Sequence, residues 1–204
     1  ADWLCSNYGA DPDATRILHT RNVIVIPCAN PDGYEYNRQI APLGGGLWRK
    51  NRRNNGNGSF GVDLNRNYGH KWGYNNIGSS AYTSSQTYRG TGPFSEPETQ
   101  GMRDFALSHD FVVTINYHTY GDLLLYTWGY SSFQPPDRLV YEVLAETATS
   151  VNNYTWGPGY TTIYETNGDA DDWMYGEQFL KKKSLSFTPE VGNSFWPSPL
   201  LIPA

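Results

Sequence analysis

Four short apolar runs, each bounded by turn-forming residues, constrain most strongly what this chain can fold into. They are residues 22–28 (NVIVIPC), 111–117 (FVVTINY), 122–127 (DLLLYT) and 184–188 (SLSFT). Runs of this length between turn formers are typical of buried strands, because helices need longer stretches.

Helical patterns lie between the apolar runs. Ser95-Glu96-Pro97-Glu98 has the form of a capping box. The apolar residues on one face behind it are Met102, Phe105 and Ala106. A second helix is expected to open at Asp137, with an apolar stripe made of Leu139, Val140, Val143, Leu144 and Val151. Since strands and helices alternate, the sequence predicts an α/β sheet with helices packed on it.

The composition indicates one domain. The 204 residues, 38% of them hydrophobic, are enough for one sizeable core, and we expect a single domain over residues 1–204. Charged residues make up 17% of the chain and the formal net charge is −5, which argues against nucleic acid or an anionic membrane as partner. We also expect a monomer.

The cellular location is indicated only indirectly. The two cysteines, Cys5 and Cys28, allow one disulfide or none. Aromatic residues reach 15%, and Asn57 and Asn153 each begin an Asn-x-Ser/Thr sequon. This combination is frequent in secreted proteins that act on peptides or glycans, so we expect an extracellular protein.

A long irregular segment carries most of the unusual chemistry. Residues 37–94 are rich in Gly, Asn, Arg and Tyr and have little periodicity, and a loop region of that length is usually functional. Arg49, Arg52, Arg53 and Arg66 lie within it. Guanidinium groups suit carboxylates and developing oxyanions, although a solvated polar loop explains the composition about equally well.

Two ionisable residues follow predicted strands. His118 comes directly after 111–117 and Glu190 two residues after 184–188, and ligands bind at the carboxyl ends of strands in open α/β sheets. A structural role is the more common one for each residue taken alone. The four histidines, His19, His70, His109 and His118, have no local His-x-x-x-His or His-x-x-Glu partner, so local spacing alone gives little support for a zinc site.

Eight short motifs nevertheless occur together in a characteristic order. They are NPDGYEY (30–36), LWRKNRR (47–53), VDLNRN (62–67), YRGTGPFSEPET (88–99), YHTYGDLLLY (117–126), TIY (162–164), DDW (171–173) and FTPEVG (187–192). In order and spacing they resemble the zinc metallocarboxypeptidases of the pancreatic carboxypeptidase A/B type over nearly the whole chain. The resemblance implies the family's mixed, mostly parallel sheet flanked by helices.

The resemblance also implies roles for individual residues. His118 resembles the third zinc ligand, and Glu190 the general base and acid. Arg52 resembles the arginine that polarises the scissile carbonyl. The residues implied in binding the substrate's C-terminal residue are Asn65 and Arg66, which grip its carboxylate, and Tyr164, which closes over it. The expected cofactor is one zinc ion, and the expected partners are peptide or protein C-termini.

Substrate preference is expected to depend on Asp171. This residue resembles the floor of the family's specificity pocket, where an aspartate accompanies preference for Lys or Arg. A buried carboxylate is costly unless a cation pairs with it, so we expect release of C-terminal Lys or Arg, or a mixed specificity.

The chain also departs from the family pattern. Thr127 stands where the pattern usually has proline. The family's His-x-x-Glu ligands lie upstream of the segment that ADWLCSNYG (1–9) resembles, and a last helix usually follows LLIPA, so we expect a fragment that is inactive by itself. The alternatives are a non-catalytic module that binds peptide C-termini through Asn65 and Arg66, and a glycan-binding domain.

Overall fold

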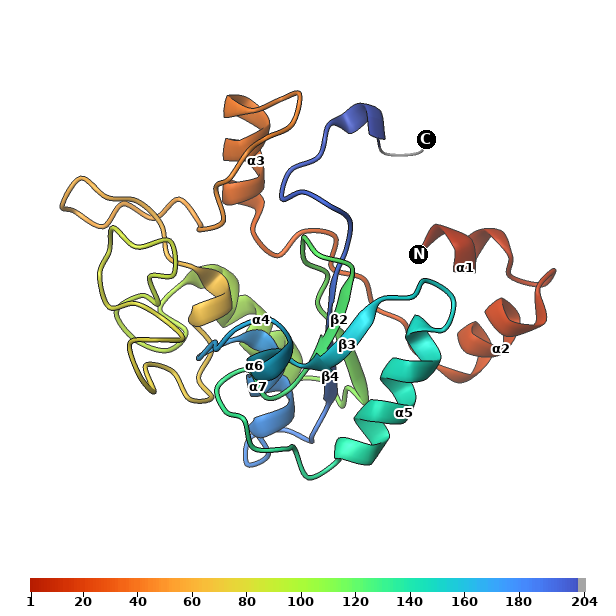
Figure 1. The fold of residues 1–204 in the computed structure, drawn as a ribbon. Helices are drawn as coiled ribbons and strands as arrows, with labels where there is room; N and C mark the ends of the chain where they lie inside the picture. Colours follow the sequence, from red (N-terminus) through yellow and green to blue (C-terminus); the bar gives the residue numbers. More distant parts are fainter. Residues whose placement is uncertain (202–204) are drawn as a thin grey trace.

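The computed structural model describes residues 1–201, and the end of the apolar tail PLLIPA lies outside the described residues. Its helices are α1 (Asp2–Ser6), α2 (Pro12–Thr20), α3 (Pro31–Ile40), α4 (Pro97–Leu107), α5 (Arg138–Thr149), α6 (Gly159–Thr162) and α7 (Ala170–Gly176). Its strands are β1 (Val113–Ile115), β2 (Leu123–Tyr126), β3 (Thr155–Pro158) and β4 (Leu185–Glu190), and the short 3₁₀ helices are η1 (Leu64–Arg66) and η2 (Pro199–Leu201). Figure 1 shows the strands at the centre, with helices and a large loop region around them.

The four strands form one mixed sheet in the order β1-β4-β2-β3. β1 runs parallel to β4, β2 runs parallel to β3, and only the β2–β4 pairing is antiparallel. The expected fold, a mixed and mostly parallel sheet flanked by helices, is therefore confirmed. β1 and β4 end at the same edge of the sheet.

Aromatic side chains fill the interface between the sheet and two helices. α5 packs on β2 and β3, and α7 packs on β4. Tyr141 of α5 stacks on Tyr126 at a centroid distance of 4.8 Å, and it contacts Tyr175 of α7 and Phe187 of β4 edge-on. Because α7 also packs against Tyr68 and Ala106 in a second apolar cluster, it joins the sheet to the loop region and α4.

Three of the four predicted strands form, although with changed limits. The 111–117 run gives only the three-residue β1, whose Val113 and Ile115 are exposed. The 184–188 run extends to Glu190. β3 was not predicted, since its Thr-Trp-Gly-Pro sequence lacks an apolar run.

The strand predicted at 22–28 is wrong. The segment has no regular secondary structure and, within residues 1–201, pairs with no strand, and Val23, Ile24, Val25 and Ile26 are exposed. An apolar run becomes a strand only where a neighbouring strand completes its ladder of hydrogen bonds.

The helix at Asp137 is confirmed, but its predicted inward stripe is wrong. Leu139, Val140, Val143, Leu144 and Val151 are all exposed. The helix instead buries Tyr141, Ala145 and Thr149, which follow one another at four-residue intervals. Tyr141 and Ala145 pack in the same apolar cluster as Leu124, Tyr126 and Phe187 of the sheet.

The capping box at Ser95 is also wrong. α4 begins at Pro97 after the N-cap residue Glu96, and no side chain caps it. The Ser95 hydroxyl instead donates to the Glu96 carboxylate at 2.7 Å. Both side chains serve contacts with distant loops, described below.

Candidate active site

His118 and Glu190 lie next to each other at the edge of the sheet where β1 and β4 end. The His118 amide donates to the Pro189 carbonyl and the Val191 amide to the His118 carbonyl, each at 2.9 Å. This isolated parallel bridge extends the β1–β4 pairing beyond β1 and brings the two residues into register.

Burial shifts the pKa values of the two residues in opposite directions. Burial, with a smaller contribution from the nearby Arg49 cation, lowers the pKa of His118 to about 4. Burial raises the pKa of Glu190 to about 7, against the opposing effect of Arg49. At neutral pH the imidazole is therefore neutral, as a metal ligand must be, while the carboxyl group is poised to accept or release a proton.

Arg49 lies at this site, although the resemblance of the sequence to the family gave it no role. Its guanidinium forms an ion pair with Asp63 at 2.9 Å. The charge of Asp63 is the main cause of a raised Arg49 pKa, and Tyr164 contributes to it as well. Since Arg49 also acts on His118 and Glu190, it belongs to the same cluster.

The structure places Arg52 against aromatic rings. Its guanidinium lies over the rings of Tyr36, Trp48 and Phe60, at 3.7, 4.4 and 5.0 Å from their centroids. Arg49 and Arg52 are three residues apart in one irregular segment, and their side chains contact different groups. Both arginines belong to the irregular segment of residues 37–94. Only the tertiary structure shows that Arg49 lies at the site and that Arg52 lies against aromatic rings.

The turn at residues 63–67 holds Asn65 and Arg66. Asp63 starts the turn by accepting the Asn65 amide at 3.1 Å, and the Asn65 side-chain oxygen accepts the Ala170 amide at 3.0 Å. Arg66 is 2% exposed, donates from Nη1 to the Asn65 carbonyl at 2.6 Å, and has no partner for Nε among the described residues. A buried guanidinium with a free donor fits an incoming carboxylate.

Tyr164 and Asp171 lie around the same cluster. Tyr164, at 48% exposure, is open to solvent beside Arg49. Asp171 accepts hydrogen bonds from Asn116 at 2.6 Å, Ser186 at 2.7 Å and Thr188 at 2.6 Å. Burial, reinforced by Asp169, raises the Asp171 pKa to about 6, although the three hydrogen bonds oppose the rise.

The donor set fits part of a zinc site. His118 offers a neutral imidazole beside a carboxyl group of raised pKa. Within residues 1–201, however, no three His, Cys, Asp or Glu side chains converge as a metal cluster. Because catalytic zinc ordinarily has about three protein ligands, a zinc ion at His118 would need further ligands from outside the described residues.

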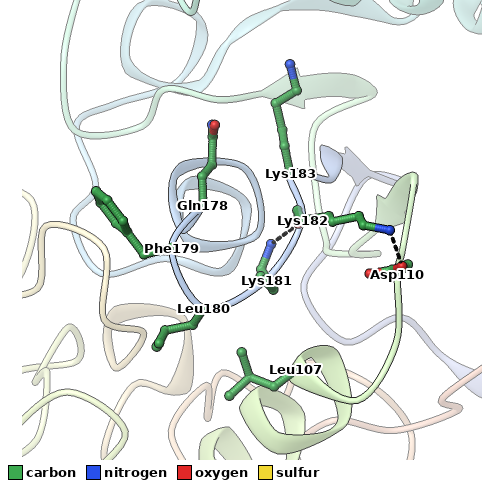
Figure 2. A pocket seen from close by; sticks show the side chains of 8 residues that line it. All are labelled: Leu107, Asp110, Gln178, Phe179, Leu180, Lys181, Lys182 and Lys183. Atoms are coloured by element: carbon green, nitrogen blue, oxygen red, sulfur yellow. Dashed lines mark hydrogen bonds and ion pairs between the residues drawn. The ribbon is translucent and has the colours of Figure 1, made fainter.

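A separate surface hollow lies away from these residues. It has a volume of about 510 Å³ and is lined by Leu107, Asp110 and residues 178–183. Figure 2 shows Phe179 and Leu180 pointing away from its lysines, with Lys182 paired to Asp110. None of the candidate site residues lines it.

The structure also describes the two cysteines and Thr127. Cys5 and Cys28 are both free and exposed. Across the part of the chain that the structure describes, no helix has the length and apolar character needed to cross a membrane. Thr127, the departure from the family pattern, is buried and donates its hydroxyl to Asp172 at 2.5 Å.

Comparison with known proteins identifies the family of the chain. The model of the zinc carboxypeptidase family matches residues 1–202. This chain belongs to the zinc carboxypeptidase family. The carboxypeptidase chain is 34% identical to rat carboxypeptidase A2 over 183 residues, covering 86% of this chain and 42% of that protein. It is 35% identical to metallocarboxypeptidase A of Trichophyton tonsurans over 203 residues, covering 94% and 46%.

Solved structures show the same fold. The crystal structure of thrombin activatable fibrinolysis inhibitor matches with a TM-score of 0.80 at 28% identity, covering 95% of this chain and 48% of that one. Carboxypeptidase A from Helicoverpa armigera matches with a TM-score of 0.70 at 31% identity, covering 87% and 44%. The carboxypeptidase chain thus spans less than half the length of these relatives.

Proposed function

We propose that this chain carries substrate-binding and catalytic residues of the active site of a zinc-dependent carboxypeptidase, which removes single C-terminal residues from peptides. The observation that carries the proposal is the convergence of two arginines, Arg49 and Arg66, with His118 and Glu190 at one edge of the sheet. Both arginines act electrostatically on both of the other residues.

Recognition of a free C-terminus is assigned to Asn65 and Arg66. An exopeptidase must distinguish the terminal carboxylate from an internal amide, and a guanidinium does so by charge and by paired hydrogen bonds. The buried Arg66 with its free Nε supports this role. Tyr164, exposed beside Arg49, is proposed to close over the bound residue.

Bond cleavage is assigned to Arg49 and Glu190. Arg49 donates to the oxygen of the scissile carbonyl as negative charge develops there, the role that the resemblance had given to Arg52. Glu190 takes the proton of the attacking water and passes it to the leaving amine, which a pKa of about 7 suits. Zinc, held in part by His118, would supply Lewis-acid chemistry when bound.

Preference for Lys or Arg is assigned to Asp171. Its carboxylate is held by three neutral donors, Asn116, Ser186 and Thr188. A substrate cation would give this half-buried carboxylate a charged partner, whereas an apolar side chain would not. Because neutral donors already satisfy part of the carboxylate, a mixed specificity is proposed rather than an absolute one.

The proposed location, oligomeric state and partners of the enzyme follow from its substrate class. We propose a secreted monomer that acts on peptide or protein C-termini, and no role in binding nucleic acid or membranes.

The test uses the protein as it is naturally produced, with zinc present. Release of the terminal residue is measured from hippuryl-Arg, hippuryl-Phe and a peptide with an amidated C-terminus. The proposal expects hydrolysis of the first two and none of the amide. Binding of free C-termini without hydrolysis would favour a non-catalytic module, and equal handling of acid and amide would exclude both.

A further inference from the structure

Two irregular segments, residues 49–53 and 63–67, carry the arginines of the candidate site. Neither lies in the sheet, so the ladder of strands does not fix them. The first segment is hydrogen-bonded instead to Glu96, and the second to Ser95, Glu96 and Thr99. These three residues lie at the beginning of α4, and we call them the α4 junction. The spatial relation of Arg49 to Arg66 therefore depends on a part of the molecule outside the site.

Glu96 holds the first segment. It is 1% exposed, and one carboxylate oxygen accepts from Arg53 at 2.6 Å and from Ser95 at 2.7 Å. The other oxygen accepts from the Asn51 side chain at 2.8 Å. Asn51 in turn pairs with Val62 through its own amide at 2.9 Å and its side-chain oxygen at 2.8 Å. Glu96 thus fixes the backbone two residues after Arg49.

Asn67 holds the second segment. It is fully buried, and its amide group donates to the carbonyls of Arg89 and Gly92 and to the Ser95 hydroxyl, at 2.8, 3.0 and 2.9 Å. Its oxygen accepts from Thr99 at 2.7 Å. These hydrogen bonds fix Asn67, which directly follows Arg66, to the same α4 junction that includes Glu96.

We infer that Glu96, Thr99 and Asn67 are positioning residues that set the separation of Arg49 from Arg66. The inference rests on the proposed function, in which one arginine meets the scissile carbonyl and the other the terminal carboxylate of one substrate. These two groups have a fixed spacing in every peptide, so the two guanidinium groups must keep theirs. A misplacement of about 1 Å can cost about 100-fold in rate.

Substitutions of Glu96 and of Thr99 are expected to change different kinetic constants. Glu96→Gln puts a donor amide among Arg53, Ser95 and Asn51, loosens the segment with Arg49, and is expected to lower kcat at least about tenfold with a smaller change in KM. Thr99→Val removes the hydroxyl that donates to the Asn67 oxygen, one of several hydrogen bonds on that side chain, and is expected to raise KM about three- to tenfold through Arg66.

Matched controls separate positioning from folding. Glu98→Gln makes the same change two residues along the chain, where, among residues 1–201, the Glu98 carboxylate accepts a single long hydrogen bond of 3.3 Å from Asn51. Thr99→Ser keeps the hydroxyl. Kinetic constants of the natural, zinc-loaded protein are measured below the unfolding transition and expressed per folded molecule, because a merely structural role lowers stability but leaves these constants unchanged.

A crystal structure of Glu96→Gln gives a readout that does not depend on activity, namely the distance between the Arg49 and Arg66 guanidinium carbons. An increased or disordered separation, with the kinetic split above, supports the inference. Wild-type activity with Glu96→Gln equal to Glu98→Gln and Thr99→Val equal to Thr99→Ser overturns it. If the wild-type protein hydrolyses nothing, the proposed function fails, and an unchanged guanidinium separation then also overturns the positioning role.

Discussion

Arg49 and Asp63 form an ion pair at 2.9 Å. This pair joins residues 49–53 to the turn that carries Asn65 and Arg66. Asp63 is almost fully buried and also accepts the Asn65 amide. One carboxylate therefore connects the arginine assigned to the scissile carbonyl with the residues assigned to the terminal carboxylate.

Exchanging Arg49 and Arg52, one at a time, for glutamine gives the sharpest test of this arrangement. Arg49→Gln is expected to lower kcat roughly 100- to 1000-fold, since it removes a charged donor from the developing oxyanion. Arg52→Gln, the matched control, is expected to leave kcat within about threefold and to lower stability by about 1 kcal/mol, because it removes stacking on Tyr36 and Trp48. Steady-state hydrolysis of hippuryl-Arg measures the first and urea unfolding the second. The opposite ranking of the two variants in kcat would refute the assignment.

Replacing Arg66 by lysine is expected to affect binding more than turnover. Lysine keeps the positive charge but cannot offer two parallel donors to a carboxylate. We expect KM to rise about tenfold or more, which corresponds to about 1.4 kcal/mol, while kcat changes less. A KM within twofold of wild type would argue against a paired contact with the terminal carboxylate.

The preference for basic over apolar C-termini is expected to depend on pH. Asp171 has a raised pKa of about 6, so it is mainly protonated below that pH and ionised above it. Only the ionised form attracts a cation, so the ratio of kcat/KM for hippuryl-Arg to that for hippuryl-Phe should rise between pH 5 and 7. Asp171→Asn should show a low ratio with no such rise. A rise that persists in this variant would show that another group controls the preference.

The backbone behind Arg66 is expected to require glycine at position 168. Gly168 has φ +71°, and a Cβ there would lie 2.6 Å from the Arg66 carbonyl oxygen. Gly168→Ala is therefore expected to lower the free energy of unfolding by about 2 kcal/mol or more and to raise KM by displacing Arg66. Gly56→Ala is the matched control: Gly56 has φ +78° with open space around its Cβ position, so only about 1 kcal/mol is expected there. Equal losses in the two variants would contradict the contact.

Lys181 is expected to make stability rise with pH. Burial lowers its pKa to about 8, below the ordinary value of 10.5. Between these two values the unfolded chain binds more protons than the folded one, so the free energy of unfolding increases as pH rises from about 8 toward 10. Lys181→Met should abolish this rise and stabilise the protein at pH 7 by about 1 kcal/mol, a figure reduced for partial solvent contact. Urea unfolding at pH 7 and 9.5 measures both, and Lys182→Met, at an exposed lysine, should keep the rise.

Much of the fold follows from local sequence. The apolar runs at 122–127 and 184–188 become strands, and the helix after Asp137 forms where its pattern predicts. His118 and Glu190 are predicted at strand ends, and the parallel β1–β4 pairing brings them together. These features depend on side-chain periodicity and on turn residues, which the sequence displays directly.

Tertiary structure alone decided the rest. The run at 22–28 has the composition of a strand, but residues 1–201 offer it no pairing partner. Arg49 and Arg52 are identical residues in the same irregular segment, and their surroundings differ. Arg49 lies beside Asp63, and Arg52 lies over aromatic rings. Ser95 and Glu96 read as a helix cap and instead hold two distant loops. In each case the outcome depends on groups far away in the chain, and local pattern carries no information about which distant group arrives.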